Sequence, residues 1–369
     1  MKANKLIKAI FILFLSLTLI LILILSGEIF FRIKKPYALA PVEYNRNEIW
    51  HWSKNLNYIS KCEEGTQIHV RTDWFGFRNY GKTIKKPKNV IRIVVIGDSY
   101  TEGLGYSDNQ VFTSLLEQNL AGLNPHNCKI EVLGASSPAW STEQEWRCLL
   151  NEAKWFEPDY VLLMVCPNDI REAYCKKFVE LTSWGEAKFN KINFNDSRIF
   201  YWKLAAHSYL YQFLQAKVFH TDFGTFPFLF AHYKFNFGKE DSTNWDRPMY
   251  LKSAFPELTN ARKLFFTLVD EMHHECNKNK VKFTVSLVPM VMEFDSTMVK
   301  DTALQSGLVS DMISYHCDTA HIDYVNLYKR FKADNDPTTF FLKSDQHFNA
   351  KGHITTAQGL AEYYKEIIK

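Results

Sequence analysis

Four short polar clusters in this chain carry side chains suited to acyl transfer. The Ser99 hydroxyl is a weak nucleophile at neutral pH, and a histidine such as His347 can take its proton and later return it to a leaving group. Asp345 stands two residues before His347 and can hold the imidazole in the required tautomer. The clusters are Gly97-Asp98-Ser99-Tyr100, Gly134-Ala135-Ser136, Asn168-Asp169 and Ser344-Asp345-Gln346-His347.

Acyl transfer also needs preorganised donors for the negatively charged oxygen of the tetrahedral intermediate. The candidate donors are the backbone N–H of Ser99, a backbone N–H near Gly134 or Ser136, and the side-chain amide of Asn168. Removing one such donor typically costs about 3 to 4 kcal/mol of transition-state stabilisation. The same clusters therefore predict an oxyanion hole beside the nucleophile.

Each residue also has a simpler structural interpretation. A serine after a strand is usually a helix N-cap, and Asn168 could merely close a turn. Asp345 could cap the last helix, and His347 could be a core histidine with a satisfied ring. The four residues occur together, each after a predicted strand or near the C-terminus, and this combination favours the catalytic interpretation.

The remaining polar candidates have supporting or structural interpretations. We expect Asp98 to brace the nucleophile turn and Asp169 to accept nearby backbone N–H groups, because an oxyanion hole gains nothing from extra negative charge. The seven cysteines contain no CxxC pair, so no zinc site and no disulfide framework is predicted. No metal and no cofactor is expected, because the remaining His and Cys groups are weak metal candidates: His273, His274, Cys276, His316, Cys317 and His321.

A parallel sheet would bring these clusters together. Short apolar runs rich in β-branched residues alternate with helical stretches, and this alternation indicates an α/β fold with helices on both faces of the sheet. Ligands of such sheets bind at the carboxyl ends of the strands, where the clusters stand. The predicted strands are residues 91–97, 129–133, 160–165, 282–288 and 323–328.

The N-terminus predicts a membrane anchor. Nineteen residues from Ala9 to Gly27 carry no charge and can cross the hydrocarbon core as a helix. The run is long for a signal peptide and lacks small residues at a cleavage site, so we expect it to remain uncleaved. Basic residues flank both ends almost equally, and the large C-terminal part is expected outside the cytoplasm, in the periplasm or extracellular space.

Composition and hydrophobic pattern divide the chain into segments. Residues 1–8 form a short tail, 9–29 the anchor, 30–88 a linker packed partly on the body, and 89–369 the main domain. Residues 171–256 interrupt that domain with a segment rich in Phe, Tyr and Trp that shows no strand pattern. This insert is either a helical cap over one end of the sheet or an apolar surface near the membrane.

Composition excludes several classes of protein. With 46% hydrophobic and 23% charged residues, the chain is globular rather than disordered. Its 44 basic and 40 acidic residues give a net charge of +4, so no nucleic-acid partner is implied.

Three of the clusters resemble the conserved blocks of the SGNH (GDSL) hydrolase family: G-D-S-Y at 97–100, P-N-D-I at 167–170 and D-Q-H-F-N-A-K-G at 345–352. The resemblance covers about residues 89–369 and implies a flavodoxin-like three-layer α/β/α fold with a five-stranded parallel sheet. It also implies Ser99 as nucleophile, Asn168 as oxyanion donor, and Asp345 with His347 as the rest of the triad. The anchor and the GFRN sequence at 76–79 are similar to membrane-tethered bacterial members.

Two departures from the family pattern affect the oxyanion hole. The family places a glycine as donor after the second strand, and alignment on the following W-S-T-E-Q-E puts Ser136 there rather than Gly134. Pro167 replaces the glycine that usually precedes Asn-Asp, but it does not alter the Asn168 side chain.

These observations support three functions. The first is a serine esterase or deacylase acting on O-acyl esters, with cell-envelope carbohydrate as the candidate carrier. The second is an O-acyltransferase that uses the same triad and passes the acyl group to a sugar hydroxyl instead of water. The third is a catalytically silent module that binds carbohydrate through aromatic residues of the insert.

Overall fold

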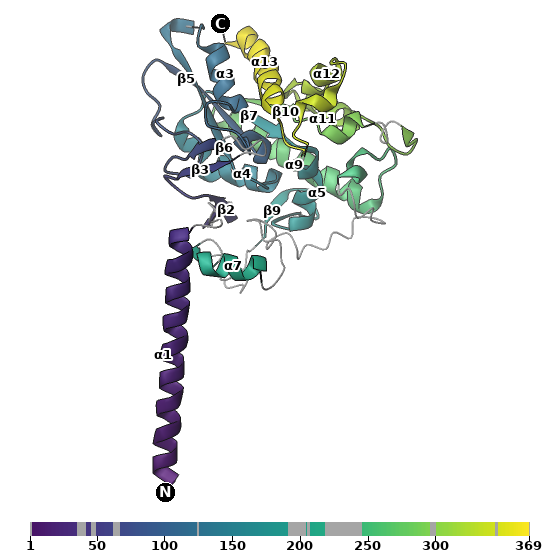
Figure 1. Ribbon diagram of the computed structural model, residues 1–369. Helices are drawn as coiled ribbons and strands as arrows, with labels where there is room; N and C mark the ends of the chain where they lie inside the picture. The colour runs from purple at the N-terminus through teal and green to yellow at the C-terminus, as the bar shows by residue number, and fades with distance from the viewer. Residues whose placement is uncertain are drawn as a thin grey trace. The chain divides into compact units, whose positions relative to one another are not determined.

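The computed structural model describes residues 2–34, 42–45, 49–61, 67–123, 125–190, 204, 207–217, 246–295, 300–343 and 346–368 (Figure 1). The chain forms two compact units. The first comprises Met1–Glu43 with Asn193–His232, and the second comprises Tyr44–Ile192 with Tyr233–Lys369. Residues 193–232, which belong to the aromatic insert, are therefore grouped with the N-terminal helix.

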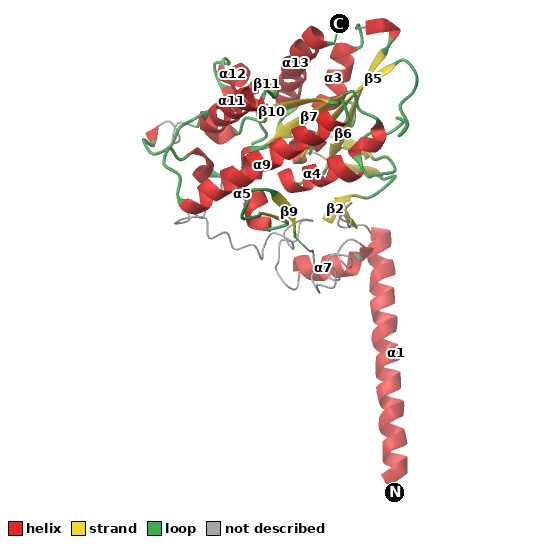
Figure 2. Ribbon diagram, turned by 180° about the vertical axis from the view of Figure 1, so that it is seen from behind, coloured by secondary structure: helices red, strands yellow, loops and turns green. Residues whose placement is uncertain are grey.

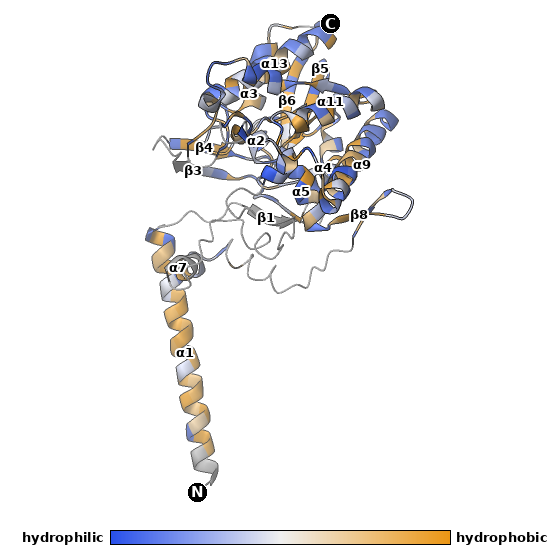
Figure 3. Cartoon of the chain, turned by 90° about the vertical axis from the view of Figure 1, so that its right-hand side faces the viewer, coloured by the Kyte–Doolittle hydropathy of each residue, from blue (hydrophilic) through white to orange (hydrophobic). Residues whose placement is uncertain are grey.

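The first unit contains one long and one short helix. Helix α1 (Lys2–Lys34) exposes its apolar side chains, and over Leu6–Lys34 it is long and apolar enough to cross a membrane, as a signal sequence would also be (Figure 3). Helix α7 (Tyr209–Lys217) packs against α1. The predicted apolar N-terminal helix is thus present.

The second unit is built on a five-stranded parallel sheet in the order β11-β10-β7-β5-β6. This confirms the predicted α/β class and strand number. Strands β5, β7 and β10 are largely buried because their β-branched and apolar side chains face helices on both sides, whereas the edge strand β11 is partly exposed. Strand β11 is shorter than predicted, since the chain enters a helix at Leu327. The strands are β5 (Val90–Gly97), β6 (Lys129–Ser136), β7 (Tyr160–Val165), β10 (Lys282–Leu287) and β11 (Asp323–Val325).

Helices cover the sheet in two layers (Figure 2). Helices α3 (Phe112–Leu120) and α13 (Ala350–Ile367) pack on each other, and α4 (Thr142–Asn151) packs on α9 (Pro256–Lys278). Because β5 lies between β6 and β7, the connection from β5 to β6 and the next one, from β6 to β7, run in opposite directions along the sheet. The carboxyl end of β5 is therefore the topological switch point of the sheet. The other elements of this unit are β2 (Ile49–Trp52), β3 (Asn57–Lys61), β4 (Gln67–Arg71), α2 (Ser99–Glu102), α5 (Pro167–Lys176), β8 (Val179–Leu181), β9 (Ala187–Phe189), α11 (Leu308–Ala320) and α12 (Leu327–Lys332), and β1 (Val42–Asn45) precedes them.

From Tyr44 onward, the segment before the sheet is part of the second unit. Trp50 in β2 is almost fully buried and donates from Nε1 to the Pro138 carbonyl at 2.9 Å. Trp140 donates from its own Nε1 back to the Trp50 carbonyl at 2.7 Å. These reciprocal bonds join residues about ninety positions apart in sequence. The described part of 30–88 also contains the short strands β2, β3 and β4, which the sequence pattern did not predict.

The beginning of the aromatic insert also differs from the prediction. Its first residues complete helix α5, and an antiparallel hairpin of β8 and β9 follows where no strand was expected. The hairpin is held by stacking of Phe189 on Trp146, with ring centroids 4.3 Å apart. Three-residue strands are too short to show an alternating pattern in sequence. Residues 191–203 and 218–245 of the insert lie outside the described residues.

Candidate active site

The nucleophile candidate stands on a sharp turn between β5 and α2. Ser99 is the first residue of α2, and Asp98 caps the helix by accepting the Tyr100 N–H at 2.9 Å. A Cβ on Gly97 would lie 2.2 Å from Thr101 Oγ1, so the residue before the cap must be glycine. The Ser99 N–H lies in the first turn of a helix, where N–H groups have no intrahelical acceptor. This turn presents a hydroxyl and a backbone donor together.

The base candidate reaches this hydroxyl from the far end of the sequence. His347 Nε2 lies 2.7 Å from Ser99 Oγ, a hydrogen bond across 248 residues. His347 is half-buried and Ser99 is 9% exposed, so the pair is shielded but accessible. Asp345, the predicted acid, lies outside the described residues.

Tyr100 places the histidine loop. Its hydroxyl donates to the Gln346 carbonyl at 2.8 Å, and its ring centroid lies 4.8 Å from that of His347. The His347 carbonyl accepts the Leu342 N–H at 2.7 Å. The residue next to the nucleophile therefore fixes the backbone beside the base. Its place in the G-D-S-Y cluster was the available sequence signal, but the contact itself is long-range.

Asn168 is held by a chain of buried polar groups on one helix. It is the second residue of α5, and its Nδ2 donates to Glu172 Oε1 at 3.2 Å. Glu172 Oε2 lies 3.0 Å from Lys176 Nζ, and Lys176 is fully buried. Lys176 also donates to the Ala139 carbonyl at 2.9 Å and to Ser141 Oγ at 2.6 Å. Glu172 and Lys176 thus connect Asn168 to the loop that follows β6, a role that the sequence analysis did not identify.

We expect Glu172→Ala to lower kcat for an aryl acetate about tenfold with little change in KM, because an Asn168 amide without its acceptor loses orientation. Glu172→Gln keeps an acceptor oxygen and should retain most of the rate. The control is Glu180→Ala at an exposed position. Circular dichroism of each variant checks folding, and an unchanged kcat in folded Glu172→Ala contradicts the role.

The two backbone candidates after β6 behave differently. Ser136 pairs in register with Gly97, so its backbone lies beside the nucleophile turn. Gly134 lies two residues earlier in β6, in register with Val95. Its N–H donates to Asn79 Oδ1 at 2.9 Å, and its carbonyl accepts a hydrogen bond from Asn79 Nδ2 at 2.8 Å. The Gly134 N–H is therefore already engaged, and we withdraw it as an oxyanion donor.

Arg78, next to Asn79 in the GFRN sequence, supports the loop behind the nucleophile helix. Its guanidinium donates to the carbonyls of Glu102, Gly103 and Tyr106 and forms an ion pair with Asp108 at 3.0 Å. The Arg78 side chain is almost fully buried. A planar fork of five donors suits this arrangement, because each N–H finds an oxygen.

Buried acids surround the nucleophile turn. Burial raises the pKa of Asp98 to about 6. Burial, reinforced by the negative charge of neighbouring carboxylates, raises the pKa of Glu145 and of Asp169 well above the usual range. Asp169 accepts the Cys166 N–H at 2.8 Å. Since the raised pKa values of Glu145 and Asp169 favour neutral carboxyl groups, these two acids oppose a nearby oxyanion less than two carboxylates would.

The histidines that the sequence offered as weak metal candidates were compared with the side chains around them in the part of the chain that the structure describes. No group of three His, Cys, Asp or Glu side chains within them could hold a metal ion. His273 Nε2 lies 2.8 Å from Asn277 Nδ2, and His316 Nε2 lies 2.7 Å from Asp270 Oδ1. These two histidines thus bond to local partners.

A buried histidine next to the site makes stability depend on pH. Burial first, then the charges of Arg78 and His347, lowers the pKa of His353 to about 3. In the unfolded chain His353 binds a proton as the pH falls below about 6.5, whereas in the folded chain it stays neutral down to about pH 3. The free energy of unfolding therefore falls as pH falls from about 6.5 to 3.

We therefore expect the wild type to lose about 2 kcal/mol more than His353→Gln between pH 7 and pH 5. Glutamine can still accept the Phe112 N–H that His353 Nδ1 accepts at 3.3 Å. Urea unfolding of both chains in detergent at the two pH values measures the difference. Equal losses in the two chains would contradict a depressed pKa.

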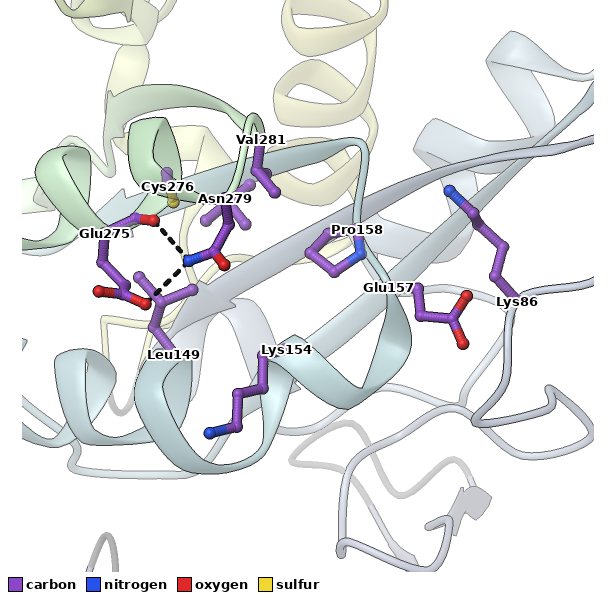
Figure 4. Close-up of a pocket in the computed structure, with 10 residues that line it drawn as sticks. Lys86, Leu149, Lys154, Glu157, Pro158, Glu275, Cys276, Asn279 and Val281 are labelled. Atoms are coloured by element: carbon purple, nitrogen blue, oxygen red, sulfur yellow. Dashed lines mark hydrogen bonds between the residues drawn. The ribbon is translucent and has the colours of Figure 1, made fainter.

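A pocket of about 280 Å³ lies elsewhere, at the amino ends of the strands (Figure 4). Pro158 and Val161 at the start of β7 and Val281 before β10 form part of its wall. Three of its polar side chains have partners, since Asn279 donates to Glu275 and Lys86 forms an ion pair with Asp159. The pocket is separate from the Ser99–His347 pair.

No protein-family model matches the sequence, and no curated protein matches it either. Solved structures do match. A lipase/acylhydrolase from Enterococcus faecalis is 14% identical with a TM-score of 0.41, covering 76% of this chain and 97% of that one. A GDSL-like lipase from Bacteroides thetaiotaomicron is 11% identical (TM-score 0.39; 75% and 88% covered), and an acetyl xylan esterase is 14% identical (TM-score 0.41; 74% and 99% covered). These three structures are thus described as a lipase/acylhydrolase, a GDSL-like lipase and an acetyl xylan esterase.

Proposed function

We propose that this chain is a serine-dependent esterase that hydrolyses O-acyl esters. The hydrogen bond of 2.7 Å between Ser99 Oγ and His347 Nε2 supports this proposal most directly. A nucleophile and base within this distance, at the carboxyl edge of a parallel sheet and beside helix-turn N–H groups, form the arrangement that acyl transfer requires.

The reaction follows from these positions. Ser99 Oγ attacks the ester carbonyl and gives its proton to His347 Nε2. Asp345, which lies outside the described residues, is assigned by its place in the sequence to orient the imidazole. The N–H groups of Ser99 and Ser136 and the Asn168 amide bind the oxyanion. His347 then protonates the departing alcohol. Water, deprotonated by His347, attacks the acyl-enzyme and releases the acid and free Ser99.

The proposal extends to place and substrate. The apolar α1 is proposed to anchor the enzyme in a membrane, with the second unit outside the cytoplasm. An ester carried by a cell-envelope carbohydrate is the substrate class that such a location makes available. The proposal takes water as the acyl acceptor, and transfer of the acyl group to a sugar hydroxyl is the alternative that the assay below separates from it.

A fluorophosphonate probe tests the nucleophile, the base and access to the site together. The probe should form a phosphonyl adduct that peptide mass spectrometry locates on Ser99, and the wild type should hydrolyse an aryl acetate. Incubation with an acyl donor and an oligosaccharide then separates hydrolysis from transfer, because transfer yields acylated sugar. Absence of an adduct in folded protein, with no hydrolysis, contradicts an esterase and leaves the binding module.

A further inference from the structure

The end of α1 is engaged by residues from the aromatic insert. The Glu28 carboxylate accepts the Ser208 hydroxyl at 2.8 Å, the Leu210 N–H at 3.0 Å and the Tyr209 N–H at 3.3 Å. These groups begin helix α7, so a carboxylate of α1 caps the N-terminus of a helix about 180 residues later in the chain. The cap therefore joins α1 to a segment of the aromatic insert.

Three further contacts surround this cap. Arg32 forms an ion pair with Glu28 at 2.8 Å and donates to the His207 carbonyl at 2.8 Å. The rings of Phe31 and Phe213 stack with centroids 4.3 Å apart. A Cβ on Gly27 would lie 3.3 Å from the Leu210 side chain, so the glycine permits close approach of α7. Polar, aromatic and steric contacts therefore fix the two helices together.

The position of the cap along α1 is informative. Glu28 is the first charged residue after the uncharged run that ends at Gly27, which is where a spanning helix would leave the hydrocarbon core. A carboxylate at that depth is costly unless it is paired. The N–H groups and hydroxyl of α7 and the Arg32 guanidinium supply such partners. The same contacts hold α7 at the level of the membrane boundary.

We propose that α1 is a permanent anchor and that α7 lies on the membrane surface as a lipid-contacting interfacial helix latched to it. A cleaved signal sequence would discard Glu28, Phe31 and Arg32, and the contacts they make to α7 would serve no purpose. Beyond its capped end, α7 bears the half-buried Tyr211 and Leu214, side chains of the type that settle between lipid headgroups and acyl chains. The partner is a phospholipid bilayer, and this proposal holds whether or not the chain is an esterase.

Fluorescence quenching in proteoliposomes tests the location of α7. The full chain carries NBD on Leu214→Cys, with Leu15→Cys in the middle of α1 as the lipid reference and Tyr315→Cys, exposed on α11, as the aqueous reference. The labelled unsubstituted chain gives the background from native cysteines. Nitroxide-bearing phospholipids should quench position 214 several times more than position 315. Equal quenching at 214 and 315 overturns the interfacial helix and favours a cap over the sheet.

Two further measurements test the latch and the anchor. Glu28→Ala removes the cap and should reduce lipid quenching at position 214, whereas Lys34→Ala at the end of the same helix should not. Unchanged quenching in Glu28→Ala overturns the latch. Intact-mass analysis of membrane-extracted protein should show α1 still attached, and a mature form beginning after it overturns the permanent anchor. Hydrolysis of an aryl acetate is measured separately, so loss of the esterase proposal is recognisable on its own.

Discussion

Ser99→Ala is expected to lower kcat for aryl acetate hydrolysis by about 10⁴- to 10⁶-fold and to abolish labelling by a fluorophosphonate. The alanine variant cannot form an acyl-enzyme on this residue, because the hydroxyl that lies 2.7 Å from His347 Nε2 is gone. KM should change little, since the oxyanion donors and the substrate-binding surface remain. Steady-state kinetics of purified chain in detergent provides both constants.

A matched control separates loss of chemistry from loss of folding. Ser114→Ala removes a half-buried serine hydroxyl from α3 that donates to the Asp108 carbonyl at 2.6 Å, away from the base. This variant should keep wild-type labelling and kcat within about a factor of two, in line with the small net value of one hydrogen bond. If Ser99→Ala hydrolysed the ester as fast as Ser114→Ala, the nucleophile would have to be another residue.

The sheet was predictable because its information is local. Residues 160–165 form an unbroken apolar run, and β7 occupies those residues. Because β5 and β7 are neighbouring parallel strands, the residues that follow them lie at the same edge of the sheet. Ser99 and Asn168 could thus be located by their place after a strand. The last strand was overpredicted, because the pattern of 323–328 does not reveal that Asn326 caps a helix by accepting the Lys329 N–H.

The supporting residues were not predictable, because their partners are distant in sequence. A local sequence pattern places the charged side chains of Arg78 and Lys176 on the surface. Both are buried instead, and carbonyl groups of other segments accept their hydrogen bonds. Asn79 is a further long-range partner. Its amide oxygen accepts the Gly134 N–H, which the sequence had suggested as an oxyanion donor. Only the fold shows which N–H groups are already used.

The second large effect is expected for His347→Ala, which should lower kcat by about the same 10⁴- to 10⁶-fold as Ser99→Ala. An unactivated hydroxyl is almost entirely protonated at neutral pH, so Ser99 without its base attacks an ester very slowly. Exogenous imidazole should restore part of the rate in His347→Ala and none in Ser99→Ala, because only the former keeps the nucleophile. Kinetics with and without imidazole measures this difference.

The double variant shows whether the two side chains act as one unit. If the proton passes between Ser99 Oγ and His347 Nε2, removing both should cost no more than removing either one, since the second removal takes away a group that no longer has a function. Independent contributions would instead multiply, and the double variant would lose the product of the two factors. Multiplication of the losses, or full activity in His347→Ala, contradicts a shared proton. Equal losses in all three variants would place the proton transfer on the contact that joins the two ends of this domain.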